Sequence, residues 1–154
     1  MNTKKILILA GALIVGLGTF FLVSSGDFLR GQIKVAYALS VSLDASVTDQ
    51  TVKEGSPNVK IASWNISAKS DTALKEMLFT FKGADAKVIN SVSLKADILE
   101  LGKGYVQNSK VSFKDINYTI KEGETKQVSL WVDISDEVEM ETKFKFTLRT
   151  LATT

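Results

Sequence analysis

The sequence contains no histidine, no cysteine and a single proline. Without histidine there is no imidazole base, no Ser-His-Asp triad and no histidine metal ligand. Without cysteine there is no thiolate nucleophile, disulfide, thiolate zinc site or iron–sulfur cluster. An excess of one charge is also missing, because 19 basic and 17 acidic residues leave a net charge of +2 in 154 residues. This balance lacks the basic footprint of a nucleic-acid-binding protein, so we expect no nucleic-acid partner.

An uncharged apolar run covers residues 6–23. Eighteen residues in a helix rise about 27 Å, at ~1.5 Å per residue, which is close to the thickness of a bilayer core. Lys4 and Lys5 precede the run, and basic residues on that side favour a cytoplasmic N-terminus with the rest of the chain outside. The run therefore predicts an N-terminal hydrophobic helix and an extracytoplasmic body, either membrane-anchored at the cell surface or secreted.

The predicted helix is either a retained transmembrane anchor or a cleaved signal peptide. A signal peptide has a basic start, an apolar core of about 7–15 residues and an A-x-A-like cleavage site. Ala36-Tyr37-Ala38 matches that site, but the apolar run is longer than a signal core, and three charged residues separate it from Ala38. We divide the chain into an export segment, residues 1–38, with a charge of +3, and an extracytoplasmic domain, residues 39–154, with a charge of −1. If the helix is uncleaved, residues 6–23 make the membrane a partner.

The extracytoplasmic domain shows apolar residues at alternate positions. Alternation places successive side chains on opposite faces of a strand, so each run predicts a half-buried strand. Seven such runs separated by turn residues predict an all-β fold, an antiparallel β-sandwich of about seven strands. The runs lie at 39–45, 64–68, 77–81, 92–98, 111–120, 128–134 and 144–148, and the turns at 54–57, 82–85, 102–104 and 121–124. The expected core anchors are Trp64, Phe79, Phe81, Phe113, Phe144 and Phe146; Trp131 is out of phase and indicates either a cap on the sheet or a contact surface.

The strongest candidate for chemistry is a group of carboxylates that could offer oxygen ligands to calcium: Asp133, Asp136, Glu137, Glu139 and Glu141. Their spacing lacks the D-x-D-x-D-G order of a dedicated calcium loop, and a solvated turn explains them equally well. Neither a G-x-S-x-G motif nor a P-loop occurs, and short turns leave no cleft for a catalytic carboxylate pair. We therefore expect no enzyme activity, no catalytic residues and no cofactor.

Two further patterns concern the surface of the domain. Asn65-Ile66-Ser67 and Asn117-Tyr118-Thr119 are N-glycosylation sequons, and both asparagines are out of phase with the apolar positions, so we expect both to face solvent. The first alternating run is a potential donor strand, since an N-terminal strand on a tether can add to an open sheet edge of a neighbouring molecule. Its apolar positions are Leu39, Val41, Leu43 and Ala45.

The segments IASWNISAKSDTALKEMLFTFKG and VSFKDINYTIKEGETKQVSLWVDIS resemble the immunoglobulin-like β-sandwich modules of prokaryotic surface and secreted proteins. This resemblance implies an Ig-like or jelly-roll-like sandwich outside the cell. LSVSLDA, TALKEMLFTF and KFKFTLRT are similar in placement to segments of TasA/camelysin-type matrix fibre proteins, which polymerise by lending a strand to a neighbour. An apolar helix that runs into a β head, with SSGDFLRGQ at its end, resembles archaeal pilins and archaellins.

Together these patterns favour a non-enzymatic structural or interaction protein of the cell surface, which binds a protein partner or itself through sheet edges. The alternative is a self-assembling extracellular filament subunit, of the pilus or biofilm-matrix kind, that polymerises by N-terminal donor-strand exchange or helix packing.

Overall fold

The structure is a computed structural model that describes residues 5–13, 39–138 and 142–154. These residues form strands joined by turns and one short 3-10 helix, η2 (Ala86–Val88). The strands are β1 (Lys5–Leu13), β2 (Leu39–Leu43), β3 (Gln50–Lys53), β4 (Val59–Ala68), β5 (Thr72–Lys82), β6 (Ile89–Ala96), β7 (Leu99–Gly104), β8 (Lys110–Phe113), β9 (Tyr118–Ile120), β10 (Thr125–Ile134) and β11 (Thr142–Thr153). The expectation of an all-β fold is confirmed.

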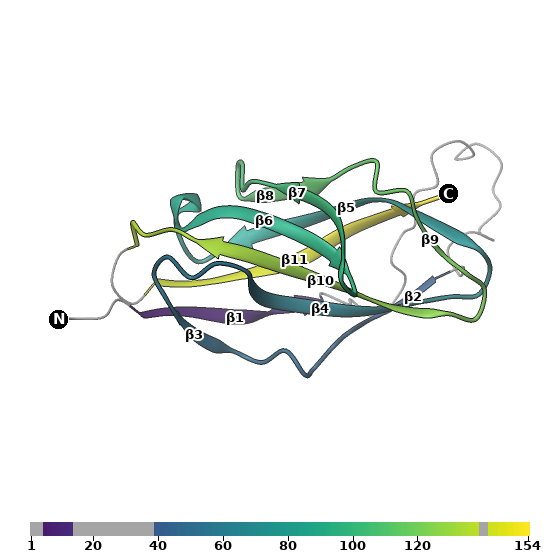
Figure 1. Ribbon diagram of the computed structural model, residues 1–154, viewed down its shortest axis with the longest axis horizontal. Coiled ribbons are helices and arrows are strands. Elements are labelled where there is room, and N and C mark those ends of the chain that lie inside the picture. The colour runs from purple at the N-terminus through teal and green to yellow at the C-terminus, as the bar shows by residue number, and fades with distance from the viewer. Residues whose placement is uncertain (1–4, 14–38, 139–141) are drawn as a thin grey trace.

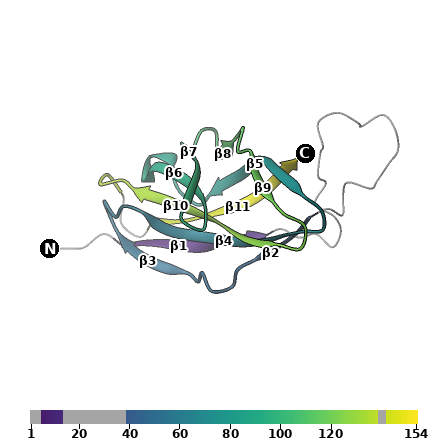
Figure 2. The same cartoon turned by 45° about the vertical axis from the view of Figure 1, so that its right-hand side comes forward.

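The strands form two sheets (Figures 1 and 2). Sheet A has the order β3-β1-β11-β5-β8, with β9 also pairing with β5, and sheet B has the order β2-β4-β10-β6-β7. Neighbouring strands are antiparallel, except that β1 runs parallel to β11. The arrangement is consistent with a β-sandwich.

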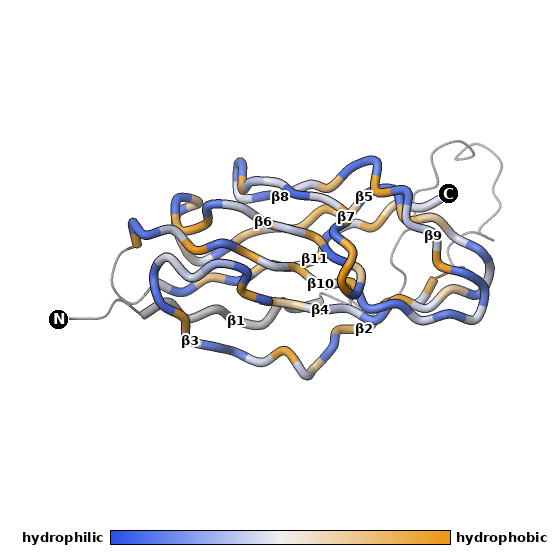
Figure 3. Tube along the Cα trace, in the orientation of Figure 1, coloured by the Kyte–Doolittle hydropathy of each residue, from blue (hydrophilic) through white to orange (hydrophobic). Residues whose placement is uncertain are grey.

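Aromatic side chains fill the core between the two sheets. Trp64 on sheet B packs against Phe79 on sheet A with their ring centroids 5.2 Å apart, and Phe79 meets Phe113 edge-on at 5.9 Å. A second group joins Phe81 to Phe144 and Phe146 at 5.5 and 5.0 Å. All six predicted anchors are buried, because they occupy the inward positions of their alternating strands. Figure 3 shows this alternation along the strands, with hydrophilic loops at the ends of the sandwich.

The structure does not show the predicted N-terminal helix over the part of it that is described. Residues 5–13 form the strand β1, while residues 14–23 lie outside the described residues. An uncharged apolar run suits a strand with neighbours on both sides as well as a helix, and periodicity alone does not separate the two. Across the described part of the chain, we find no helix with the length and apolar character needed to span a membrane.

Two predictions in the middle of the chain are wrong. Residues 102–104 belong to the strand β7, where a turn was expected. A Cβ atom on Gly102 or Gly104 would lie 3.1 Å from the side chain of Phe113 or Val111, respectively, so glycine fits here without displacing either side chain. The run 92–98 ends earlier than expected, since β6 stops at Ala96 and Ile98 is 99% exposed in the turn that follows.

Near Ala62-Ser63 the sequence changes phase, because Val59 and Ile61 have the opposite parity to Trp64 and Ile66; such a slip indicates a bulge, and the structure has one there, one residue earlier. The pairing of β10 with β4 shifts between Leu130, which faces Ala62, and Trp131, which faces Lys60. Ile61 is therefore the extra residue, and the stretch from Ile61 to Trp64 is buried without interruption. An extra residue changes which face the following side chains point to, and this change of phase is what the sequence displays.

Candidate interaction site

The most unusual feature of the fold is the position of β1, a strand inserted between two strands from distant parts of the chain (Figure 1). It pairs antiparallel with β3 from Lys5 to Ile8, and parallel with β11 from Ile6 to Leu13. In the strand order, β3 joins sheet A only through β1. Without β1, both β3 and β11 would present open edges, and open edges are templates for another strand. We call this position between β3 and β11 the strand site.

The strand site has one apolar side and one basic side. Along β11, Phe144, Phe146 and Leu148 are buried against the core. The intervening Lys143 is exposed and Lys145 is half-buried, and Lys53 at the end of β3 is exposed. An incoming strand therefore meets apolar side chains on its inner face and positive charge on its outer face. These demands are met by a strand that alternates apolar residues with polar or acidic ones.

The strand β1 meets these demands only in part. The register pairs Ile8 with the buried Phe144, but it pairs Leu7 with the exposed Thr51 and Lys143. The pairing with β11 also shifts between Leu9 and Ala12. Leu7 and Leu9 are paired with the lysines Lys143 and Lys145, and the ladder is interrupted. The strand site therefore accepts β1 mainly through backbone pairing and not through a close match of side chains.

The predicted donor strand is β2, at the edge of sheet B. It pairs antiparallel with β4, from Leu39 opposite Ala68 to Leu43 opposite Trp64. Leu39 and Val41 are partly buried against the core, whereas Leu43 is 36% exposed. Ala45 lies in the turn after the strand and is exposed. An edge strand with only part of its surface buried is held less firmly than a central one.

The predicted carboxylate group is distributed over a strand and a turn. The Asp133 carboxylate, on β10, accepts a hydrogen bond from the Asn58 backbone N–H at 2.8 Å and one from the Ser91 hydroxyl at 2.7 Å. These two hydrogen bonds hold the pKa of Asp133 below its usual value, and the bond from the Asn58 backbone has the larger effect. Asp136 and Glu137 follow in the turn, and Glu139 and Glu141 lie outside the described residues. Within residues 5–13, 39–138 and 142–154, no three acidic side chains are grouped as metal ligands.

The two sequon asparagines have different surroundings. Asn117 is exposed and has a positive φ of 51°. Its side-chain oxygen accepts a hydrogen bond from Lys75, and its amide group donates one to the Asp115 carbonyl at 3.1 Å. Asn65 is half-buried on β4, between its register partners Ser42 and Gln127. The expectation of a solvent-facing asparagine is confirmed for Asn117, and Asn65 is less accessible than expected.

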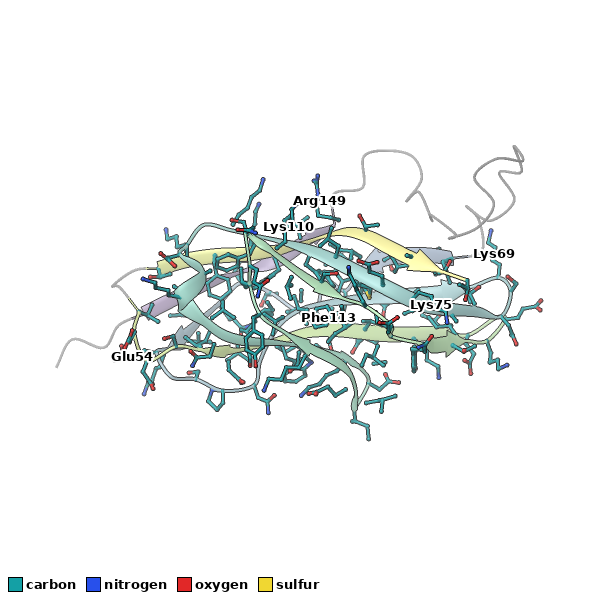
Figure 4. All side chains as sticks on the ribbon, turned by 90° about the horizontal axis from the view of Figure 1, so that it is seen from above. Glu54, Lys69, Lys75, Lys110, Phe113 and Arg149 are labelled. Atoms are coloured by element: carbon teal, nitrogen blue, oxygen red, sulfur yellow. The ribbon has the colours of Figure 1, made fainter. Side chains whose placement is uncertain are left out.

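Trp131 lies on the outer face of sheet B. It is half-buried, its indole N–H donates to the Ser129 hydroxyl at 2.8 Å, and the Lys95 ammonium lies 4.6 Å from the ring centroid. Its polar tip and one ring face thus have partners within the sheet. The outer face of sheet A is also polar: Figure 4 shows Lys110 and Arg149 projecting away from the strands, whereas Phe113 is buried.

Sequence reasoning missed the strand site, because it needs β1 and β3, and neither was predicted as a strand. The β-branched residues Ile6 and Ile8 were the available signal for β1, since such residues favour strands. β3 is only four residues long, too short for a convincing alternation.

Comparison with known proteins does not identify a family for this chain. No protein-family model matches the chain, and no curated protein matches it.

Proposed function

We propose that this chain is a non-enzymatic structural and interaction protein of the cell surface. Its export would depend on the apolar residues 6–23, with basic residues before them. Its body would be an Ig-like or jelly-roll-like sandwich that binds protein partners through sheet edges. The observation that supports this proposal most strongly is the strand site, in which β1 pairs along two edges of sheet A.

Cell fractionation tests the location. The protein should be found in the envelope or the medium, and an intact-mass measurement should show either the full chain or a chain that begins at Leu39. Finding the protein only in the cytoplasm would contradict the proposal.

A second candidate function, a filament subunit that polymerises by strand exchange, is favoured by the match between the strand site and residues 39–45. In this arrangement Val41 and Leu43 of a second copy take the register positions of Ile6 and Ile8, which are paired with Val52 and Phe144. Ser42 takes the position of Leu7, opposite the exposed Thr51 and Lys143. Apolar residues then fall at inner positions and polar residues at outer ones.

Charge also favours residues 39–45 over β1 in this site. In the same register Asp44 takes the position of Leu9, opposite Lys145, where opposite charges across a strand pair contribute about 0.2–1 kcal/mol. In its present position, the Asp44 carboxylate accepts a hydrogen bond from the Gln127 side chain at 2.8 Å and one from the Ser46 backbone N–H at 2.9 Å. Exchange of β2 would therefore replace the contact of Asp44 with Gln127 by one with Lys145, and each copy would offer a donor strand and an acceptor edge.

The substitution Val41→Asp tests the filament candidate, with Ser42→Asp as its matched control. In a chain cut after Ala38, Val41→Asp should abolish filaments, because it places a carboxylate at an inner position of the strand site. Ser42→Asp should leave them intact, because its carboxylate lies at the outer position opposite Lys143.

Negative-stain electron microscopy is the measurement, with urea unfolding to show that both variants are folded. Filaments of Val41→Asp at wild-type yield would contradict the assignment of residues 39–45 as the donor strand. Filaments absent from the cut wild-type chain would contradict the filament candidate itself.

A further inference from the structure

We infer that residues 5–13 are an internal occupant of the strand site, and that they keep the uncut chain from assembling until they leave it. This inference rests on the second candidate function, strand exchange between copies. It adds the regulation of that site: the position that a second copy would fill is already filled from within the chain.

The first step of the argument is that β1 closes the edges through which copies would join. Lys5 to Ile8 pair with β3 on one side, and Ile6 to Leu13 pair with β11 on the other. A sheet edge recruits another strand through its unpaired N–H and C=O groups. With β1 in place these groups on β3 and β11 are engaged, so a donor strand has to displace β1 before it pairs.

The second step is that β1 is replaceable. Its pairing with β3 covers four residues, and its pairing with β11 is interrupted between Leu9 and Ala12. Leu7 is paired with two exposed polar residues, Thr51 and Lys143, whereas residues 39–45 offer a serine at that register position. β1 therefore fits the site well enough to close it and less well than the donor strand of another copy.

The third step is that the covalent connection gives β1 an advantage only while the chain is intact. A joined segment binds intramolecularly at an effective concentration in the millimolar range. A second copy at micromolar concentration competes at a disadvantage of about a thousandfold. Cleavage after Ala38 removes this advantage, because the freed segment dilutes into solution.

The fourth step is that residues 6–13 also belong to the apolar run of the predicted export segment, which covers residues 6–23. Residues 6–13 lie either in sheet A or in a bilayer, and not in both. Insertion of the segment into the membrane, or its removal, therefore opens the strand site when the body has been exported. Assembly would be restricted to the outside of the cell.

The test compares four preparations of the full chain. The first is the wild-type chain with a specific protease site within residues 28–34, left uncut, and the second is the same protein cut after folding. The third is uncut Ile8→Pro, which removes an N–H at the residue that pairs with both Gln50 and Phe144. The fourth is uncut Ala10→Pro, a matched control in the irregular part of the ladder, where proline is tolerated.

Light scattering and electron microscopy give the protein concentration at which half of the chains are assembled. We expect the cut chain and Ile8→Pro to assemble at a concentration at least tenfold lower than the uncut wild type and Ala10→Pro. A 50-fold excess of a peptide of residues 4–13 should slow assembly of the cut chain. The cut and peptide measurements keep the inference testable if Ile8→Pro does not fold.

Two results would overturn the inference, and they are distinguishable. Equal assembly of the cut and uncut wild-type chains would show that residues 5–13 do not close the site, while strand exchange between copies would stand. No assembly in the cut chain would reject strand exchange, and with it the regulation proposed here.

Discussion

Truncation of Phe79 to alanine tests whether the two sheets share the core described above. Phe79 is fully buried and lies between Trp64 of sheet B and Phe113 of sheet A. A phenylalanine buries about 150–250 Å², which at about 25 cal/mol per Å² corresponds to roughly 4–6 kcal/mol of transfer free energy. Alanine keeps part of this burial, while the cavity adds a cost, so the expected loss of unfolding free energy is about 3–5 kcal/mol.

Urea unfolding followed by tryptophan fluorescence measures this loss, since Trp64 packs directly on the Phe79 ring. The matched control is Tyr105→Ala, an aromatic truncation at a residue that is 62% exposed, for which the expected change is within about 0.5 kcal/mol. The slope of unfolding free energy against urea should stay the same in both variants. A loss below about 1 kcal/mol for Phe79→Ala, or equal losses in the two variants, would refute the assignment of Phe79 to the shared core.

Two further predictions concern a carboxylate and a pair of glycines. Asp133→Asn should lower the unfolding free energy at pH 7 by about 1–2 kcal/mol, because the amide replaces an ionised hydrogen-bond acceptor. Folding lowers the pKa of Asp133, so the stabilisation by its carboxylate is present above the unfolded pKa of about 3.9 and is lost as the pH falls through the folded pKa. Urea titrations should therefore show that the difference in unfolding free energy between the wild type and Asp133→Asn becomes smaller from pH 7 to pH 3. A difference that stays constant would contradict this. Gly83→Ala should lower the melting temperature more than Gly123→Ala. Both glycines have a positive φ, which is strained for alanine. A Cβ atom at Gly83 would also lie 2.6 Å from the Lys143 carbonyl oxygen, whereas a Cβ atom at Gly123 would have no neighbour within 4 Å. Equal melting temperatures for the two glycine variants would show that the chain next to β11 moves aside.

The two sheets differ in how their edge strands are held. Every described strand of sheet B pairs within its sheet from β2 to β7, while β3 depends on β1 for its place in sheet A. A sandwich that is completed by a segment from its own N-terminus can be completed by the same kind of segment from another molecule, because backbone pairing is largely independent of sequence. In the proposed filament, the donor strand of a second copy would differ from β1 in how well its alternating apolar and polar residues match the apolar and basic sides of the site.

The sequence by itself determined most of the longer strands of the body and most of the core, whereas β3 and β7 were not predicted. Alternation in runs such as 128–134 has one physical meaning, because only a strand places every second side chain on one face. The six aromatic anchors therefore followed from parity alone, and all are buried. Even the bulge at Ile61 left a readable change of phase in the sequence.

The tertiary structure alone decided what the pattern left open. An apolar run such as 6–23 has no alternation, so whether part of it lies in a sheet depends on whether two strand edges are free to receive it, and those edges belong to β3 and β11. Gly102 and Gly104 appear as turn residues in the sequence, but they lie in the strand β7, where Phe113 and Val111 of β8 approach them closely. In each case the deciding contact joins residues far apart in the chain, and a local pattern carries no information about that contact.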